Sequence, residues 1–398
     1  MSRLSICQLG DLIEFQRGYD LPKSKFVAGP YPVQSSNGIL GYHNEYKVEA
    51  PGITIGRSGT VGLPHMLEEN FYPHNTALYI KDFKGNDVRY IYYLLKYLKL
   101  GYKKSGSGVP TMNRNHLHPL TINAFRDITD QKSISSVLHL VDQKIELNNR
   151  INAELEAMAK TLYDYWFVQF DFPDSNGKPY KASGGKMVYD PTLKRDVPDE
   201  WEVTTVGKIA KTELGGTPST AVDEYWNDAD IPWLSSAETA SFPVTTSEQK
   251  ITQAGIDNSA ATLLPKGTVI ISIVRYIRPS ILGIDSATNQ SVVGIRECKR
   301  LKSSFIYPYF CSEVPRLMGL RTGAQQPHIN KGVIEKSPIV IPSDKALTDY
   351  YKVADPIFEK IMNLAFQNQE LMQLRDWLLP MLMNGQVTVN QSTEPKIA

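Results

Sequence analysis

The sequence predicts an α+β chain in which two similar α/β heads are separated by two long helices that form an antiparallel coiled coil. Two observations lead to this fold class. A helical pattern occurs twice, 216 residues apart, and each half of the chain carries the same succession of strand-like, aromatic and polar-loop segments. The 398 residues are 41% apolar, which is ample for two packed cores.

The helical pattern places apolar residues at alternating steps of three and four, as along the seam of a coiled coil. The first copy of the seam contains Val137, Val141, Ile145, Leu155 and Leu162, and the second contains Val353, Ile357, Ile361, Leu371 and Leu378. Asn152 falls on Asn368 after the shift of 216, and Asn148 and Arg375 are further polar seam residues. Polar residues in a seam fix register and partner choice. The alternative is a helix end that packs against its own head.

The two heads are expected at residues 1–125 and 201–342, and they share five features in order. Both open with a short pattern, Leu9-Gly-Asp-Leu12 and Val206-Gly-Lys-Ile209. Strand-like runs follow at 52–56 and 267–273, then aromatic runs with helical spacing at 90–95 and 305–310. Polar loops at 105–113 and 322–330 lead to short apolar runs at 120–122 and 339–342. We therefore expect one α/β head used twice.

The remaining residues connect and end these parts. Helical regions are expected at 126–170 and 343–385. A turn-rich linker at 171–200 is indicated by its Pro, Gly, Asp and Ser residues. Residues 386–398 lack periodicity and are expected to be a flexible tail.

Catalytic and targeting signatures are missing from the sequence. Gly184-Gly-Lys-Met187 does not complete a phosphate-binding loop, and no HExxH or G-x-S-x-G pattern occurs. His116 and His118 are expected to flank the end of a loop rather than a helix face, which argues against a metal site. The three cysteines form no CxxC pair, and no apolar run is long enough to span a membrane. The sequence predicts a cytoplasmic protein that binds no metal or cofactor and catalyses no reaction.

The remaining polar residues of the heads are suited to binding DNA. The first head is mildly basic, with 14 Lys and Arg against 9 Asp and Glu, although a solvated helix face would explain its lysine cluster equally well. Arginine reads guanine, Asn and Gln read adenine, and Lys or loop amides hold phosphates. The candidates in the first head are Arg57, Ser58, His74, Asn75, Lys103, Lys104, Ser105, Thr111, Asn113 and Arg114. Those in the second head are Thr217, Arg275, Tyr276, Arg278, Asn289, Gln290, Arg321, Gln325, Gln326, His328, Asn330 and Lys331. For Asn113 and Asn330, capping of a helix or turn is an equally good interpretation.

Three motifs resemble the specificity subunits of Type I restriction-modification systems. They are Leu162-Tyr-Asp-Tyr-Trp-Phe-Val-Gln-Phe-Asp-Phe-Pro173, Gly215-Gly-Thr-Pro-Ser219 with Ile231-Pro-Trp-Leu234, and Leu374-Arg-Asp-Trp-Leu-Leu-Pro-Met-Leu-Met-Asn-Gly385. The first head departs from the pattern, because Gln16-Arg-Gly-Tyr-Asp20 stands where Gly-Gly-Thr-Pro-Ser is expected.

The resemblance implies a non-catalytic DNA-recognition subunit with two target recognition domains, each reading one half of a split double-stranded target. It also implies a coiled coil that holds the heads apart and docks two methyltransferase subunits. Through them it would join restriction and translocase subunits. S-adenosylmethionine, ATP and Mg would belong to the partner subunits. A methyltransferase or nuclease acting alone, and a scaffold that binds protein or sugar, are the rival interpretations.

Overall fold

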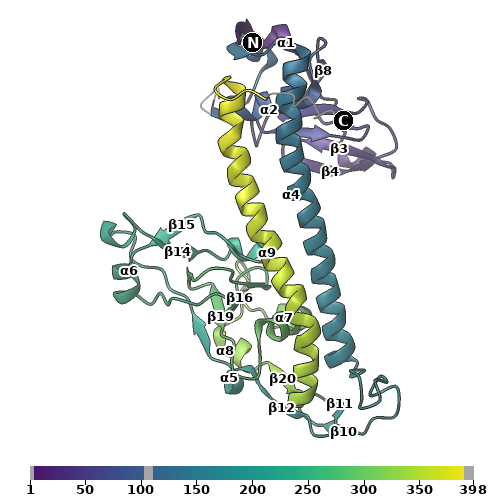
Figure 1. Cartoon of the computed structure of the whole chain (residues 1–398), viewed down its shortest axis with the longest axis vertical. Helices are drawn as coiled ribbons and strands as arrows, with labels where there is room; N and C mark the ends of the chain where they lie inside the picture. Colours follow the sequence, from purple (N-terminus) through teal and green to yellow (C-terminus); the bar gives the residue numbers. More distant parts are fainter. Residues whose placement is uncertain (1–3, 103–110, 390–398) are drawn as a thin grey trace, which may run out of the picture. The chain divides into compact units, whose positions relative to one another are not determined.

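The computed structural model describes residues 4–102 and 111–389, and the chain divides into two compact units (Figure 1). Unit 1 comprises Met1–Glu146 with Glu370–Ala398, and unit 2 comprises Leu147–Gln369. The first head belongs to unit 1 and the second head to unit 2. Two long helices, α4 (Ile128–Tyr163) and α9 (Asp344–Met383), each contribute one part to each unit.

The first head is built on two small sheets and a terminal strand pair. The larger sheet is antiparallel, in the order β2 (Glu14–Arg17), β8 (Ala77–Asp82), β5 (Gly52–Gly56) and β6 (Pro64–Leu67). The smaller sheet has the order β4 (Gly38–His43), β3 (Tyr31–Ser35) and β7 (Tyr72–Pro73), with β7 parallel to β3. β1 (Ser5–Gln8) pairs with β9 (Thr121–Ala124) and closes the head.

The second head has the same topology strand for strand. Its larger sheet has the order β13 (Thr212–Leu214), β19 (Val292–Ile295), β16 (Val269–Ser272) and β17 (Arg278–Ile281). Its smaller sheet has the order β15 (Gln249–Ile251), β14 (Ile231–Leu234) and β18 (Ala287–Thr288), again with one parallel pair. β12 (Glu202–Thr205) pairs with β20 (Pro338–Ile341). The prediction of one α/β head used twice is confirmed.

Both aromatic segments form helices, as their spacing predicted. They are α2 (Val88–Leu98), capped by Asp87, and α7 (Ser303–Gly319). Pro308 lies inside α7 and has no N–H to donate to the carbonyl of Ser304, four residues earlier. That carbonyl accepts instead from the hydroxyl of Tyr350 at 2.9 Å, so the proline is tolerated.

Short helical turns complete the heads. The first head contains α1 (Leu9–Leu12), η1 (Lys23–Lys25), η2 (Leu100–Tyr102) and α3 (Arg114–Leu117). The second contains α5 (Val206–Ile209), η4 (Asp223–Tyr225), η5 (Glu238–Ala240), α6 (Gln253–Asp257) and α8 (Lys331–Glu335). The expectation for the two histidines was wrong, since His116 lies within α3 and His118 follows its last residue. His118 has a structural task, because its Nε2 accepts the N–H of Phe15 at 2.9 Å.

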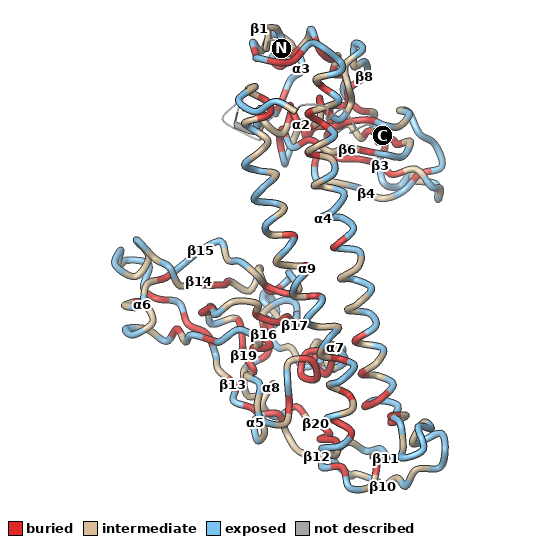
Figure 2. The backbone as a smooth tube through the Cα atoms, viewed as in Figure 1, coloured by how far each residue is buried: buried red, intermediate tan, exposed pale blue. Residues whose placement is uncertain are grey.

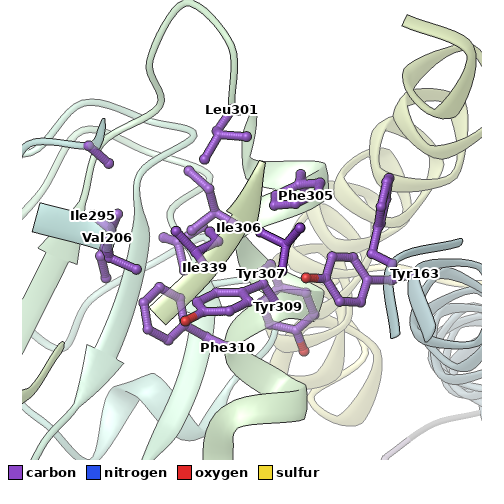
Figure 3. Packing of buried hydrophobic residues seen from close by; sticks show 14 of the residues in the cluster. Tyr163, Val206, Ile295, Leu301, Phe305, Ile306, Tyr307, Tyr309, Phe310 and Ile339 are labelled. Carbon is purple, nitrogen blue, oxygen red and sulfur yellow. The ribbon is translucent and has the colours of Figure 1, made fainter. Parts of the chain in front are cut away.

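Each core joins a head to the helix ends of its own unit (Figure 2). In unit 1 the end of α9 contributes Leu382 and Met383, both fully buried among the side chains of the first head. In unit 2 the end of α4 continues into a π-helical turn, Asp164–Val168, that buries Trp166 and Phe167. Figure 3 shows Tyr163 close to the aromatic side chains of α7, and its ring centroid lies 5.2 Å from that of Phe305.

α4 and α9 pair along the predicted seam. In unit 2 the Nδ2 of Asn148 donates to the Oδ1 of Asn368 at 2.8 Å, and that of Asn152 donates to the carbonyl of Ile361 at 3.3 Å. The partner number falls as the donor number rises, so the pairing is antiparallel, as predicted. In unit 1 Arg375 forms an ion pair with Asp142 at 2.9 Å. The predicted packing of helix ends on a head also occurs, so the two interpretations are not exclusive.

One seam residue was predicted wrongly. Val353 is 48% exposed, whereas its neighbour Ala354 is fully buried against the core of unit 2. This part of α9 packs on the head through Tyr350 and Ala354, which are four residues apart and therefore lie on the same side of the helix. Val353 lies on a different side and faces solvent. The other predicted seam residues are buried or half-buried.

The residues between α4 and the second head hold more structure than their turn-rich composition suggested. β10 (Met187–Asp190) and β11 (Arg195–Pro198) form a hairpin, and Phe172 stacks on Trp201 with ring centroids 4.6 Å apart. Within the predicted tail, Val389 packs on the core of unit 1, and residues 390–398 lie outside the described part of the chain. The predicted domain bounds themselves stay predictions.

Candidate DNA interface

In each head, one arginine that follows a central strand is joined to the polar loop by the backbone. Arg57 follows β5, and its carbonyl accepts from the N–H of Met112 at 2.8 Å. Arg275 follows β16, and its N–H donates to the carbonyl of Pro327 at 2.8 Å. Segments that are more than 50 residues apart in the sequence therefore form one polar face in each head.

The face of the first head encloses a hollow of about 610 Å³. Four predicted residues line it, namely Arg57, Thr111, Asn113 and Arg114. Gln16, Arg17 and Asp20 also line it and were not among the predicted residues. They belong to the segment that replaces the Gly-Gly-Thr-Pro-Ser motif, and this replacement was the signal that could have revealed them.

Two predicted residues of the first head lie deeper. Ser58 is half-buried, and its N–H donates to the carbonyl of Thr76 at 3.2 Å. The Nδ1 of His74 lies 3.1 Å from the hydroxyl of Thr76. Burial lowers the pKa of His74, which favours its neutral ring. Asn75, the next residue, reaches the surface beside Asp20 and donates to its carboxylate through Nδ2.

The face of the second head carries three exposed side chains, two on the turn after β16 and one at the start of β17. Arg275 has a positive φ of 62°, Tyr276 is 59% exposed, and the guanidinium of Arg278 stacks on the ring of Tyr276 at 4.8 Å. A planar pair of this kind offers a stacking surface and several N–H donors to a base or phosphate.

Several predicted residues of the second head support the loop itself. Arg321 donates through Nε to the carbonyl of Met318 at 3.0 Å and through Nη1 to the carbonyl of Arg275. The Nδ1 of His328 lies 3.0 Å from the carbonyl of Gln326. Gln325 and Gln326 are exposed on the same loop. These contacts tie the start of the loop to α7 and to the turn after β16, and the two glutamines face solvent.

The capping interpretation of the two asparagines is confirmed. The Oδ1 of Asn113 accepts the N–H of Asn115 at 3.0 Å, and that of Asn330 accepts the N–H of Val333 at 3.1 Å. Lys331 forms an ion pair with Glu335 at 3.2 Å, which offsets part of its charge. Lys103, Lys104 and Ser105 lie outside the described residues.

Residues 4–102 and 111–389 contain neither a metal-binding cluster nor a membrane-spanning helix. No cluster of three or more His, Cys, Asp or Glu side chains could hold a metal ion there. No helix in that part of the chain is both long and apolar enough to cross a membrane.

Comparison with known proteins agrees with this arrangement. The family described as "Type I restriction modification DNA specificity domain" matches residues 1–157 and 198–371, which is more than half of the chain. The chain belongs to this family. Its members serve Type I restriction-modification systems as non-catalytic DNA-recognition subunits, so the exposed polar faces of this specificity subunit are candidate DNA contacts.

Named relatives and a solved structure are similar to this specificity subunit over most of its length. The MjaIX specificity subunit of Methanocaldococcus jannaschii is 27% identical over 76% of this chain and 69% of its own. The HindI specificity subunit of Haemophilus influenzae is 23% identical over 73% of this chain and 74% of its own. The crystal structure of an S subunit from M. genitalium matches with a TM-score of 0.61 and 15% identity over 96% of each chain, which shows a shared fold.

Proposed function

We propose that this specificity subunit reads a bipartite target in double-stranded DNA, with each head reading one part. The observation that carries the proposal is the pair of polar faces built on one backbone frame. In both heads the residue directly after the central strand accepts an N–H from the polar loop, Met112 to Arg57 at 2.8 Å and Ile329 to Ile273 at 3.0 Å, while the side chains around this bond differ. A constant frame with variable side chains is suited to two different half-sites.

The polar side chains of the two faces supply the chemistry that direct readout needs. Arg57, Arg275 and Arg278 can donate two hydrogen bonds to guanine, and Gln325 and Gln326 can pair with adenine. The caps use the Oδ1 of the two asparagines, and their Nδ2 groups are proposed to contact DNA. The lysines of the 103–104 segment are proposed to hold phosphates, which position the protein without reading sequence.

The long helices are proposed to recruit two methyltransferase subunits and, through them, restriction and translocase subunits. Unit 1 exposes large apolar residues on both helices, with Leu140 at 65%, Leu374 at 43% and Trp377 at 56%. Exposed apolar residues on a helix are typical of a surface for another protein. S-adenosylmethionine, ATP and Mg are proposed to bind the partners, and the complex to act in the cytoplasm.

Two single variants separate the two roles. Trp377→Ala is expected to lower co-purification with a methyltransferase subunit, while Tyr276→Ala, at a residue of nearly equal exposure, is expected to leave it unchanged. Tyr276→Ala should instead weaken DNA binding by the assembled complex. The opposite assignment of effects would contradict the proposal.

DNA binding by the complex should also fall steeply as salt rises, because phosphate contacts release counterions. Binding that is indifferent to salt would favour a scaffold for protein or sugar. Methyl transfer by the purified chain alone, from labelled S-adenosylmethionine, would favour a self-sufficient methyltransferase.

A further inference from the structure

The two heads share a second piece of backbone frame, at the start of the larger sheet. Gly18 follows β2 and Gly215 follows β13. A Cβ on Gly18 would lie 2.2 Å from the carbonyl oxygen of His74, and one on Gly215 would lie 2.3 Å from that of Asn289. Both positions need glycine because two chain segments pass each other there.

Hydrogen bonds confirm that these positions correspond. The N–H of Tyr19 donates to the carbonyl of Pro73 at 2.8 Å, and the N–H of Gly216 donates to that of Thr288 at 2.8 Å. It follows that Asp20 corresponds to Thr217, two residues after each glycine. Asn75 likewise corresponds to Gln290.

At this corresponding place each head holds an amide side chain with a hydrogen bond of its own. In the first head the Nδ2 of Asn75 donates to the carboxylate of Asp20. In the second head the hydroxyl of Thr217 donates to the Oε1 of Gln290 at 2.6 Å. Asp20, Thr217 and Gln290 are exposed, and Asn75 is half-buried.

The two hydrogen bonds use opposite ends of the amide. A carboxylate only accepts, so Asp20 engages the NH₂ group and leaves the oxygen of Asn75 as the outward acceptor. In the observed bond the hydroxyl of Thr217 donates to the oxygen of Gln290, which leaves its NH₂ group as the outward donor. In the major groove, adenine and cytosine offer an amino donor, whereas guanine and thymine offer a carbonyl acceptor.

We propose that Asp20 and Thr217 are positioning residues that set the polarity of the amides, so that Asn75 reads an amino base and Gln290 reads a keto base at equivalent places in the two half-sites. This inference rests on the proposed function, because it assumes that both faces contact base edges. It adds which class of base each head selects at one position of its half-site, and which neighbouring side chain orients the amide that makes the selection.

The test uses the complete complex with its methyltransferase partner and a DNA library randomised across the target. Thr217→Asp turns the amide of Gln290 around, because a carboxylate can engage only its NH₂ group. The expected result is a change from keto to amino preference at one position of one half-site, by about tenfold. Thr217→Val has nearly the same shape and no donor, so it should lose the preference at that position and still bind.

Two controls are needed. One tests whether added charge alone changes the base preference, and the other distinguishes failure of this inference from failure of the proposed function. Ser219→Asp adds the same charge two residues away, on a side chain that accepts the N–H of Ala221, and should leave the base preference unchanged. If Thr217→Val kept the keto preference while Arg275→Gly relaxed another position, the inference would be overturned and the proposed function would stand. If none of these variants, Arg275→Gly included, altered the recognised sequence, the proposed function would fail with it.

Discussion

Arg275 has an unfavourable backbone conformation, and both of its backbone polar groups are hydrogen-bonded. Its φ of 62° costs an L-residue about 1 kcal/mol, and glycine would avoid this cost. Its N–H donates to Pro327 and its carbonyl accepts from Arg321, so both backbone groups hold the turn in place. A strained arginine retained at an exposed turn is best explained by a use for its guanidinium.

Arg275→Gly therefore tests the side chain without adding strain. We expect the complex to lose roughly tenfold or more of its discrimination at one base pair, while the stability of the chain is unchanged or slightly higher. Selection from a randomised DNA library and thermal unfolding measure the two effects. Lys250→Ala, at an exposed residue of β15, is the control. Uniform weakening on all sequences with a shallower salt dependence would assign Arg275 to a phosphate instead.

The ionised carboxylate of Glu213 is expected to make the stability of the second head depend on pH. Burial opposes its ionisation, but the hydrogen bonds from Arg296 and Lys211 outweigh burial and hold the pKa of Glu213 below its ordinary value of 4.5. A carboxylate whose pKa is lowered by folding stabilises the fold above the unfolded pKa, and the contribution disappears as the pH falls through the folded pKa.

We expect Glu213→Gln to lower the free energy of unfolding by about 1 kcal/mol at pH 7. The difference from the unchanged protein should shrink as the pH falls below 4.5. Urea unfolding at pH 7 and at lower pH values measures it. A difference that stays constant across this range would mean that the ionised carboxylate does not contribute.

At the scale of elements, spacing predicted the helices well and the sheets incompletely. The aromatic runs at 90–95 and 305–310 predicted α2 and α7, although Pro308 argued against a helix until Tyr350 is seen to satisfy the free carbonyl. The strand order was beyond the sequence, because β3 and β7 pair across a long connection and β7 has only two residues. The missed lining residues Gln16, Arg17 and Asp20 have a similar cause, since the pairing of β2 with the distant strand β8 brings their segment to the face.

Asn148 of α4 and Asn368 of α9 form a buried polar layer between the two helices, and its contribution to stability can be tested. Asn148 is fully buried and donates to both Gln367 and Asn368 at 2.8 Å. Asn148→Ala leaves the acceptor of Asn368 buried without its donor, and we expect a loss of about 2 kcal/mol in the free energy of unfolding.

The double variant Asn148→Leu with Asn368→Leu should recover most or all of that loss, because an apolar pair leaves no unsatisfied group. It should also weaken the choice of register that the polar layer enforces. Urea unfolding of both single leucine variants and the double variant gives the coupling between the two residues. Single effects that simply add would show that the two asparagines do not act as a pair.

At the scale of the whole molecule, each unit is completed by residues from distant parts of the chain. The first head buries Leu382 and Met383 of α9, and the helix α4 contributes Gln131, whose side chain contacts Asn86 at 2.7 Å. The sequence repeat predicted two heads and two helices. It could not predict which helix end completes which core, because helical periodicity describes the buried face of a helix and not its partner.

Because the core of unit 1 includes the end of α9, an exchange of the first head should include that helix end. Replacing residues 1–125 alone with those of a related subunit would leave Leu382 and Met383 facing a foreign core, and we expect that chimera to lose stability. Replacing residues 1–146 together with 370–398 keeps the core of unit 1 intact. We expect this second chimera to assemble with the methyltransferase partner of the donor system.

Sequencing of methylated DNA from cells that carry the second chimera gives the outcome. One half of the methylated motif should become that of the donor, and the half read by unit 2 should be unchanged, because none of its residues has been replaced. Thermal unfolding of the two chimeras provides the comparison of stability. A stable second chimera whose motif changed in both halves would mean that the heads do not read separately. An unchanged motif would mean that unit 1 does not read DNA, since its whole polar face would have been exchanged without effect.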